Sequence, residues 1–189
     1  MNAGTVWIIV GVLVVLAIIF ILIYNSMVRS RNRVEEAWSG IDVQLKRRHD
    51  LVPSIVDAVR GYAGHERETF ERTTRARAEA MRVLGSSPRA EAEAEASLSG
   101  ALGGVRVVVE DYPDLRATEN FQRLQRDLTQ VEDEIQASRR IYNSNTQAYN
   151  TKIQIFPSSI VARLAGFRPR EFFEIADGSD REPVEVTFG

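Results

Sequence analysis

The chain opens on a long apolar run, and later apolar positions recur among charged ones. Residues 5–24, TVWIIVGVLVVLAIIFILIY, carry no charge. Twenty helical residues, at about 1.5 Å each, reach about 30 Å, the thickness of the hydrocarbon core of a bilayer. Trp7 and Tyr24 lie near the two ends, where aromatic rings favour the membrane interface. We therefore predict a transmembrane helix over 5–24, preceded by a short external N-terminus at 1–4.

A cleaved signal peptide is the competing interpretation of this run. It would need basic residues before the run, a shorter run, and small residues at a cleavage site. The preceding MNAG has no basic side chain, and YNSMVRSRNR follows the run. Arg29, Arg31 and Arg33 are therefore candidate membrane-proximal residues. By the positive-inside rule they place the N-terminus outside and residues 29–189 in the cytoplasm.

After the apolar run, apolar positions step by three and four, the period of one helix face. The first such stripe predicts a helix over 29–62. Its members are Val34, Trp38, Ile41, Leu45, Val52, Ile55, Val59 and Tyr62. Pro53 interrupts the hydrogen-bond ladder, so either Asp50 caps a new helix or one helix bends here. The unbroken phase of the stripe favours a bend.

A second stripe predicts a helix over 66–84, and Gly85 provides a stop. Its members are Phe70, Thr73, Arg77, Met81 and Leu84. A third helix is predicted over 88–111, with Ser87 as its N-cap and Pro88 as its first residue. Its sequence RAEAEAEAS alternates like a strand, and VRVVV is the best strand candidate, but Ala and Glu favour helix. The three–four spacing of a helix also continues across VRVVV. The residues that keep it are Leu98, Leu102, Val105, Val109 and Tyr112.

The longest stripe predicts a helix over 118–156 that ends before Pro157. Its members are Phe121, Leu124, Leu128, Val131, Ile135, Ser138, Tyr142, Asn145, Tyr149, Ile153 and Phe156. The predicted fold is all-α: a transmembrane helix followed by an elongated, antiparallel four-helix, coiled-coil-like bundle over 29–175. Residues 176–189 lack a pattern and are predicted to form a flexible tail.

The long last helix must run back toward the membrane beside the first. A short helix over 159–166 would then lie near the inner leaflet. One side of this segment is expected to carry Ile160, Val161, Leu164 and Phe167 and to rest on the bundle base or on lipid. Ile160, Leu164 and Phe167 are the candidate membrane-proximal residues.

Composition excludes several kinds of chemistry. The chain has no cysteine, which removes disulfides, thiolate nucleophiles and the usual zinc-finger ligand sets. The net charge is -2, and the sequence has no stripe of basic and aromatic residues of the kind that binds nucleic acid. His49–Asp50 and His65–Glu66 invite a metal interpretation, but no second histidine has the spacing of a metal motif. We expect no catalytic, cofactor-binding or metal-binding residue.

Two polar clusters remain as candidate interaction surfaces. KRRHD includes Arg47 and Arg48 and has the charge for anionic lipid, but it lies about 30 Å of helix beyond the membrane. YNSNTQAYN includes Asn143, Asn145 and Asn150. Its polar residues either form a seam that fixes helix register or provide a surface for a partner or oligomer; the seam is favoured.

Three segments together resemble the LemA family: YNSMVRSRNRVEEAWSGIDVQLKRRHDLVPSIVDAVRGYAGHE, YPDLRATENFQRLQRDLTQVEDEI and YNSNTQAYNTKIQIFPSSIVARLAGF. The similarity extends from the apolar run to about Glu174. It implies a bacterial inner-membrane protein with an N-terminal anchor, a helical bundle, no enzyme activity and no cofactor. One relative takes part in organising magnetosome membranes, and others are encoded near membrane proteases. The resemblance implies no catalytic residues.

These features lead to one principal hypothesis of function. The chain is expected to be a non-catalytic, membrane-anchored scaffold that contacts lipid and self-associates or organises membrane protein partners. The alternative is an adaptor or regulator of an envelope-stress membrane protease or sensor. A hydrolase-like enzyme that uses His49 or His65 is the weakest hypothesis.

Overall fold

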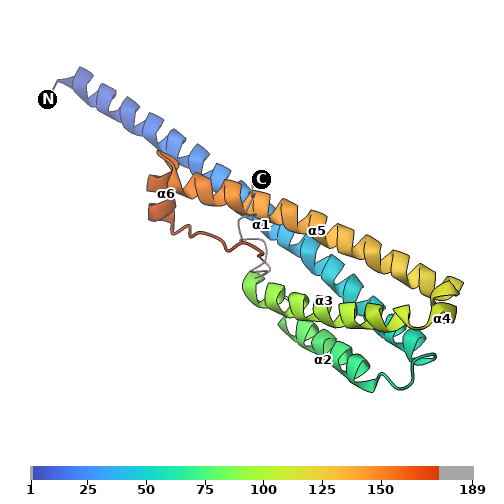
Figure 1. Cartoon of the computed structure of the whole chain (residues 1–189). Helices are drawn as coiled ribbons and strands as arrows, with labels where there is room; N and C mark the ends of the chain where they lie inside the picture. The colour runs from blue at the N-terminus through green and yellow to red at the C-terminus, as the bar shows by residue number, and fades with distance from the viewer. Residues whose placement is uncertain (1, 175–189) are drawn as a thin grey trace, which may run out of the picture. The chain divides into compact units, whose positions relative to one another are not determined.

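The computed structural model describes residues 2–174, and these form six helices and no strand (Figure 1). The prediction of an all-α fold with a long apolar N-terminal helix is therefore confirmed. The predicted tail at 176–189 lies outside the described residues. The helices are α1 (Ala3–Arg60), α2 (Arg67–Val83), α3 (Pro88–Glu110), α4 (Pro113–Ala117), α5 (Glu119–Gln154) and α6 (Ser158–Ala165).

Helix α1 joins two predicted elements into one. The sequence analysis separated a span over 5–24 from a helix over 29–62, whereas Ala3–Arg60 is one continuous helix. The linking residues 25–28 contain neither glycine nor proline, so nothing in them interrupts the helical ladder. Pro53 lies inside the same helix, and no new helix begins at Asp50. Among the described residues, this is the one helix long and apolar enough to cross a membrane.

The chain divides into two compact units, which α1 and α5 both enter. Among the described residues, unit 1 contains residues 2–43 and Ile135–Phe172, and unit 2 contains Gln44–Glu134 with Phe173 and Glu174.

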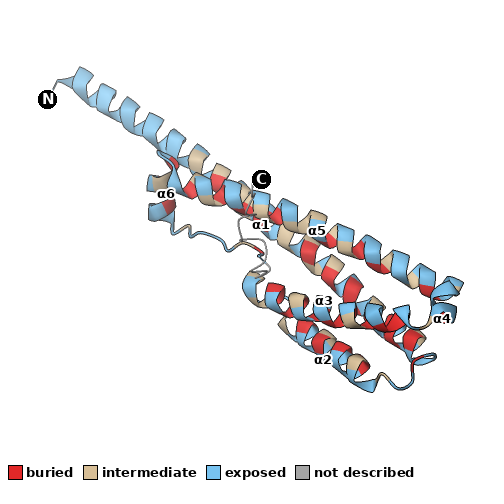
Figure 2. Ribbon diagram, viewed as in Figure 1, coloured by how far each residue is buried: buried red, intermediate tan, exposed pale blue. Residues whose placement is uncertain are grey.

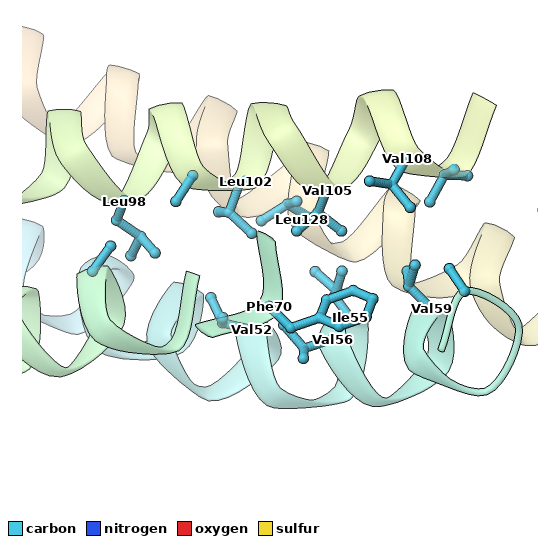
Figure 3. Close-up of a cluster of buried hydrophobic side chains, with 14 of the residues drawn as sticks. Val52, Ile55, Val56, Val59, Phe70, Leu98, Leu102, Val105, Val108 and Leu128 are labelled. Carbon is cyan, nitrogen blue, oxygen red and sulfur yellow. The ribbon is translucent and has the colours of Figure 1, made fainter. Parts of the chain in front are cut away.

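Unit 2 contains four helical segments that run alternately up and down: the end of α1, α2, α3 and the start of α5 (Figure 1). Their predicted stripes meet in one apolar core (Figure 3). The labelled members of the core are Val52, Ile55, Val56, Val59, Phe70, Leu98, Leu102, Val105, Val108 and Leu128. Helix α4, a single turn beginning at Pro113, was not predicted.

Two stripes of unit 2 differ from prediction at single positions. Met81 is 47% exposed, and α2 buries Ala76 and Ala80 instead. Alanine lets neighbouring helices approach closely, and a stripe drawn only from large residues misses it. Tyr62 is half exposed because α1 ends at Arg60, before it. At the start of α3, the predicted Ser87 cap is present and accepts a hydrogen bond from the Ala90 N–H at 3.3 Å.

Unit 1 pairs the first part of α1 with the second part of α5, side by side and antiparallel (Figure 1). Met27, Val34 and Ile41 of α1 are buried here, whereas residues 3–22 are exposed along the whole apolar run (Figure 2). Phe156, predicted to end the core stripe of the long helix, is 80% exposed because α5 ends two residues earlier.

Candidate functional site

Three contacts fix the register between α1 and α5 in unit 1. The rings of Trp38 and Tyr142 have centroids 5.1 Å apart. Asn145 donates a hydrogen bond to the backbone carbonyl of Arg33 at 3.2 Å. Nearer the apolar run, Lys152 Nζ lies 3.1 Å from Ser26 Oγ and 3.4 Å from its carbonyl oxygen. Polar side chains of α5 thus bind backbone and hydroxyl groups of α1 as far as Ser26, two residues after the end of the apolar run.

Helix α6 begins directly after the turn that ends α5. The Ser158 hydroxyl donates to the Lys152 carbonyl at 2.6 Å and so holds the turn. At the other end Gly166 has a φ of 72°, a left-handed conformation that glycine adopts without steric cost. The Phe167 N–H then donates to the Ala162 carbonyl at 3.0 Å. These two devices fix the length and direction of α6.

The two faces of α6 have different surroundings. Val161 and Ala162 are buried, whereas Ile160 and Leu164 face solvent, with exposed fractions of 52% and 74%. Just after the helix, the Phe167 ring packs edge-on against Tyr24, with 5.7 Å between centroids. Of the three apolar residues predicted to lie near the membrane, Phe167 therefore packs against α1, whereas Ile160 and Leu164 are exposed.

The three arginines predicted to lie near the membrane also differ in exposure. Arg29 and Arg33 are exposed, and Arg31 is half-buried. The Arg31 guanidinium lies 5.8 Å from the centroid of the Phe167 ring and 3.8 Å from a carboxylate oxygen of Glu35. The geometry at Phe167 is that of a cation–π contact.

The YNSNTQAYN segment binds a piece of chain that follows α6. We call residues 167–172 the strap. The Tyr142 hydroxyl donates to the Glu171 carbonyl at 2.8 Å, and the Tyr149 hydroxyl to the Arg168 carbonyl at 2.9 Å. Asn150 exchanges two hydrogen bonds with the backbone of Arg170, at 2.8 and 2.9 Å. Burial raises the pKa of Tyr149 above its ordinary value, which further favours the protonated hydroxyl that donates this bond.

The predicted interaction residues of this segment thus bind within the chain. Asn145 binds the backbone of α1 and Asn150 binds the strap, while Asn143 is half-buried. Arg170 also pairs with Glu35 at 2.7 Å. Sequence reasoning missed the strap because residues 167–172 have no periodicity. The available signal was the alternation of tyrosine and asparagine, whose donors need acceptors when they are buried.

Unit 2 contains a buried polar cluster that sequence reasoning also missed. His49 Nε2 lies 2.6 Å from a carboxylate oxygen of Glu95, and the two residues are 1% and 4% exposed. Arg48 Nη1 lies 3.3 Å from the other oxygen, and Arg48 Nη2 donates to Ser99 at 2.6 Å. Arg48, predicted on an interaction surface, is in fact buried, because Glu95 in the alternating RAEAEAEAS segment points inward.

Arg47 and His65, which the sequence analysis also considered as candidates, are not part of the buried cluster. Arg47 is exposed and pairs with Glu134 at 3.3 Å, and His65 is exposed. Within residues 2–174, no group of three His, Cys, Asp or Glu side chains is arranged to hold a metal ion. Unit 2 also has a groove of about 830 Å³, lined by residues of α1, α3 and α5 that include Leu102 and Phe121.

Pro53 provides a second link to the buried cluster. Proline has no N–H, so the carbonyl four residues earlier, that of His49, has no helical donor. The Arg77 side chain of α2 fills this gap and donates to the His49 carbonyl at 2.6 Å. Arg77, predicted on the inward stripe of its helix, therefore joins α2 to the proline site of α1.

Comparison with known proteins gives one consistent result. The model of the LemA family matches residues 37–188. "Protein LemA" of Metamycoplasma hominis is 28% identical over 172 residues, which cover 89% of this chain and 77% of that protein. "Magnetosome protein MamQ 2" of Paramagnetospirillum magneticum is 25% identical, covering 91% of this chain and 73% of that protein. "Magnetosome protein MamQ" of Magnetospirillum gryphiswaldense is 23% identical, covering 95% and 76%. With most of its length matched, the chain belongs to the LemA family.

Proposed function

We propose that this protein is a non-catalytic helical scaffold, anchored in the bacterial cytoplasmic membrane, that self-associates or organises partner proteins there. The observation that carries the proposal is the continuity of α1. Its exposed apolar residues 3–22 pass without a break into the buried residues Met27, Val34 and Ile41. One helix therefore serves as the anchor and as part of the folded body.

The other features support association rather than chemistry. The polar groups that the fold gathers, such as Glu95 with His49 and Asn150 with the strap, are bound to one another. The names of the matched family and relatives state no reaction, and the relatives named MamQ refer to a cell structure.

We further propose that residues 29–189 lie in the cytoplasm. Arg29 and Arg33 are exposed shortly after the apolar run, whereas residues 1–4 contain no basic side chain. A reporter fused after Gly189 that is active only in the cytoplasm is the expected result. Activity of the same fusion only outside the cytoplasm would contradict this topology.

The self-association can be tested by mass. The full-length protein, solubilised in a mild detergent at micromolar concentration, is expected to have a protein mass of two or more copies of 21.3 kDa. A strict monomer would contradict self-association. A monomer that is captured in cells by a membrane protease or sensor would favour the adaptor alternative instead.

A further inference from the structure

We propose that the corner between α5 and α6 inserts into the lipid leaflet on the side where the bundle emerges, as a second membrane contact beside the α1 span. The apolar corner, as we define it, consists of Ile155, Phe156, Ile160 and Leu164. The proposal rests on the proposed function, because it takes α1 to be a membrane span.

The apolar corner is the largest concentration of exposed apolar side chains in unit 1 outside the span. Within ten residues of chain, Ile155 is 53% exposed, Phe156 80%, Ile160 52% and Leu164 74%. Ile160 and Leu164 are four residues apart and so share one helix face, while Val161 and Ala162 face inward. Large exposed apolar groups gathered in this way mark contact with a partner or a membrane.

The register of α5 against α1 gives the depth of the corner. Asn145 binds Arg33, and seven residues later Lys152 binds Ser26, seven residues earlier in α1. Helix α5 ends at Gln154, which this antiparallel register places level with Tyr24, about 3 Å beyond Ser26 on the side of the apolar run. Phe156 follows Gln154 by two residues, so it lies near the level of the last turn of the span.

The far end of α6 agrees with this depth. Phe167 packs on Tyr24, the final residue of the apolar run, and the Arg31 guanidinium lies over the Phe167 ring. The chain therefore enters and leaves α6 close to the level of Tyr24, which is where a bilayer changes from hydrocarbon to headgroups if α1 spans it.

The charges around the corner favour a membrane over a protein partner. Residues 1–34 and 141–170 contain no acidic residue, and they contain the basic residues Arg29, Arg31, Arg33, Lys152, Arg163, Arg168 and Arg170. The first acidic residues, Glu35 and Glu171, lie just outside these segments. An apolar edge bordered by basic side chains matches the hydrocarbon and the anionic headgroups of a bacterial inner leaflet.

The chain has no cysteine, so single cysteines can be labelled with nitroxide without background. We would label Phe156→Cys and Leu164→Cys in the full-length protein, reconstituted in vesicles of phosphatidylethanolamine and phosphatidylglycerol. Leu13→Cys, in the apolar run, is the control for lipid. Ile141→Cys is the matched control for water, because it is apolar, 58% exposed and farther along α5 from the span.

Accessibility to oxygen, which partitions into lipid, is compared with accessibility to a nickel chelate, which stays in water. Labels at positions 156 and 164 are expected to have the high oxygen accessibility and low nickel accessibility of the label at position 13. Their nickel accessibility should be several-fold below that of the label at position 141. Ile155→Cys repeats the test if the Phe156 variant does not fold.

Two results would overturn the proposal alone: labels at 156 and 164 as accessible to nickel as that at 141, or dipolar broadening that places a second copy on the corner. If the label at 13 is also in water, the anchor of the proposed function fails, and this proposal fails with it.

Discussion

At the scale of single residues, Glu95 is buried together with its two partners, Arg48 and His49. Replacement by alanine leaves Arg48 and His49 buried without their acceptor. Loss of one member of a buried ion pair costs about 3–5 kcal/mol. We therefore expect Glu95→Ala to lower the free energy of unfolding by that amount in urea titrations of the detergent-solubilised protein.

Glu93 is the matched control, since it lies on the same helix and pairs with Arg89 at 3.1 Å on the surface. Glu93→Ala is expected to cost less than about 1 kcal/mol. A double variant, Arg48→Met with Glu95→Gln, should lose less than the sum of its single changes, because both charges leave together. Equal effects of Glu95→Ala and Glu93→Ala would contradict the structural role of the cluster.

Asp42 gives a prediction about pH. Its Oδ1 is buried without a hydrogen-bond partner among the described residues, and burial raises its pKa above the ordinary value. The folded state then favours the protonated carboxyl, so stability is greatest below the ordinary pKa and falls as pH rises through the folded pKa. We expect Asp42→Asn to be more stable than the natural protein at pH 7, with the difference shrinking toward pH 4 in thermal melts. A difference that grows on acidification would contradict this.

At the scale of elements, α1 and α2 are joined where proline leaves a carbonyl free. Arg77→Met keeps the aliphatic stem but removes the donor to the His49 carbonyl. A hydrogen bond from a charged group contributes about 1.5–3 kcal/mol, so a destabilisation of that size is expected. In a Pro53→Ala background the helix supplies its own N–H, and the same Arg77 change should cost distinctly less. Identical costs in the two backgrounds would show that Arg77 does not serve the proline site.

Beyond Phe167 the strap is not helical, and hydroxyl and amide groups of α5 bind its backbone. Tyr149→Phe combined with Asn150→Ala removes the bonds to Arg168 and Arg170. Trypsin should then cleave after Arg170 several-fold faster, because the strap detaches more often. Gln147→Ala is the control on the exposed side of α5. Unchanged cleavage in the double variant would mean that other contacts hold the strap.

The helices themselves were largely predictable, because their stripes have the 3.6-residue period. Val52, Leu98 and Leu128 lie in the core as the pattern indicated. Buried positions that a stripe of large apolar residues leaves out were not predictable. Glu95 is buried because its partners come from another helix, and Ala80 packs because it is small. The strap depends on contacts between segments about 20 residues apart, which periodicity does not encode.

At the scale of the whole molecule, the sequence predicted a membrane span and a helical body but placed a boundary between them. The structure removes that boundary, since Ala3–Arg60 is a single helix. The corner at Phe156 was expected to lie in the core stripe, and its exposure became clear only from the end of α5 and the register with α1. The continuous helix joins the apolar run directly to the packed residues of unit 1, which the proposed membrane-bound scaffold requires.

The central claim is that the protein works by association at the membrane, and crosslinking in intact cells tests it most directly. A photoreactive residue would replace Val43, Val107 or Ile141, which are 58–63% exposed outside the apolar run and the corner. Val131, which is buried, is the control position. We predict adducts in the membrane fraction that contain a second copy or a defined membrane protein, from at least one exposed position and not from Val131. No adduct from any exposed position, with the protein present in the membrane fraction, would contradict the account.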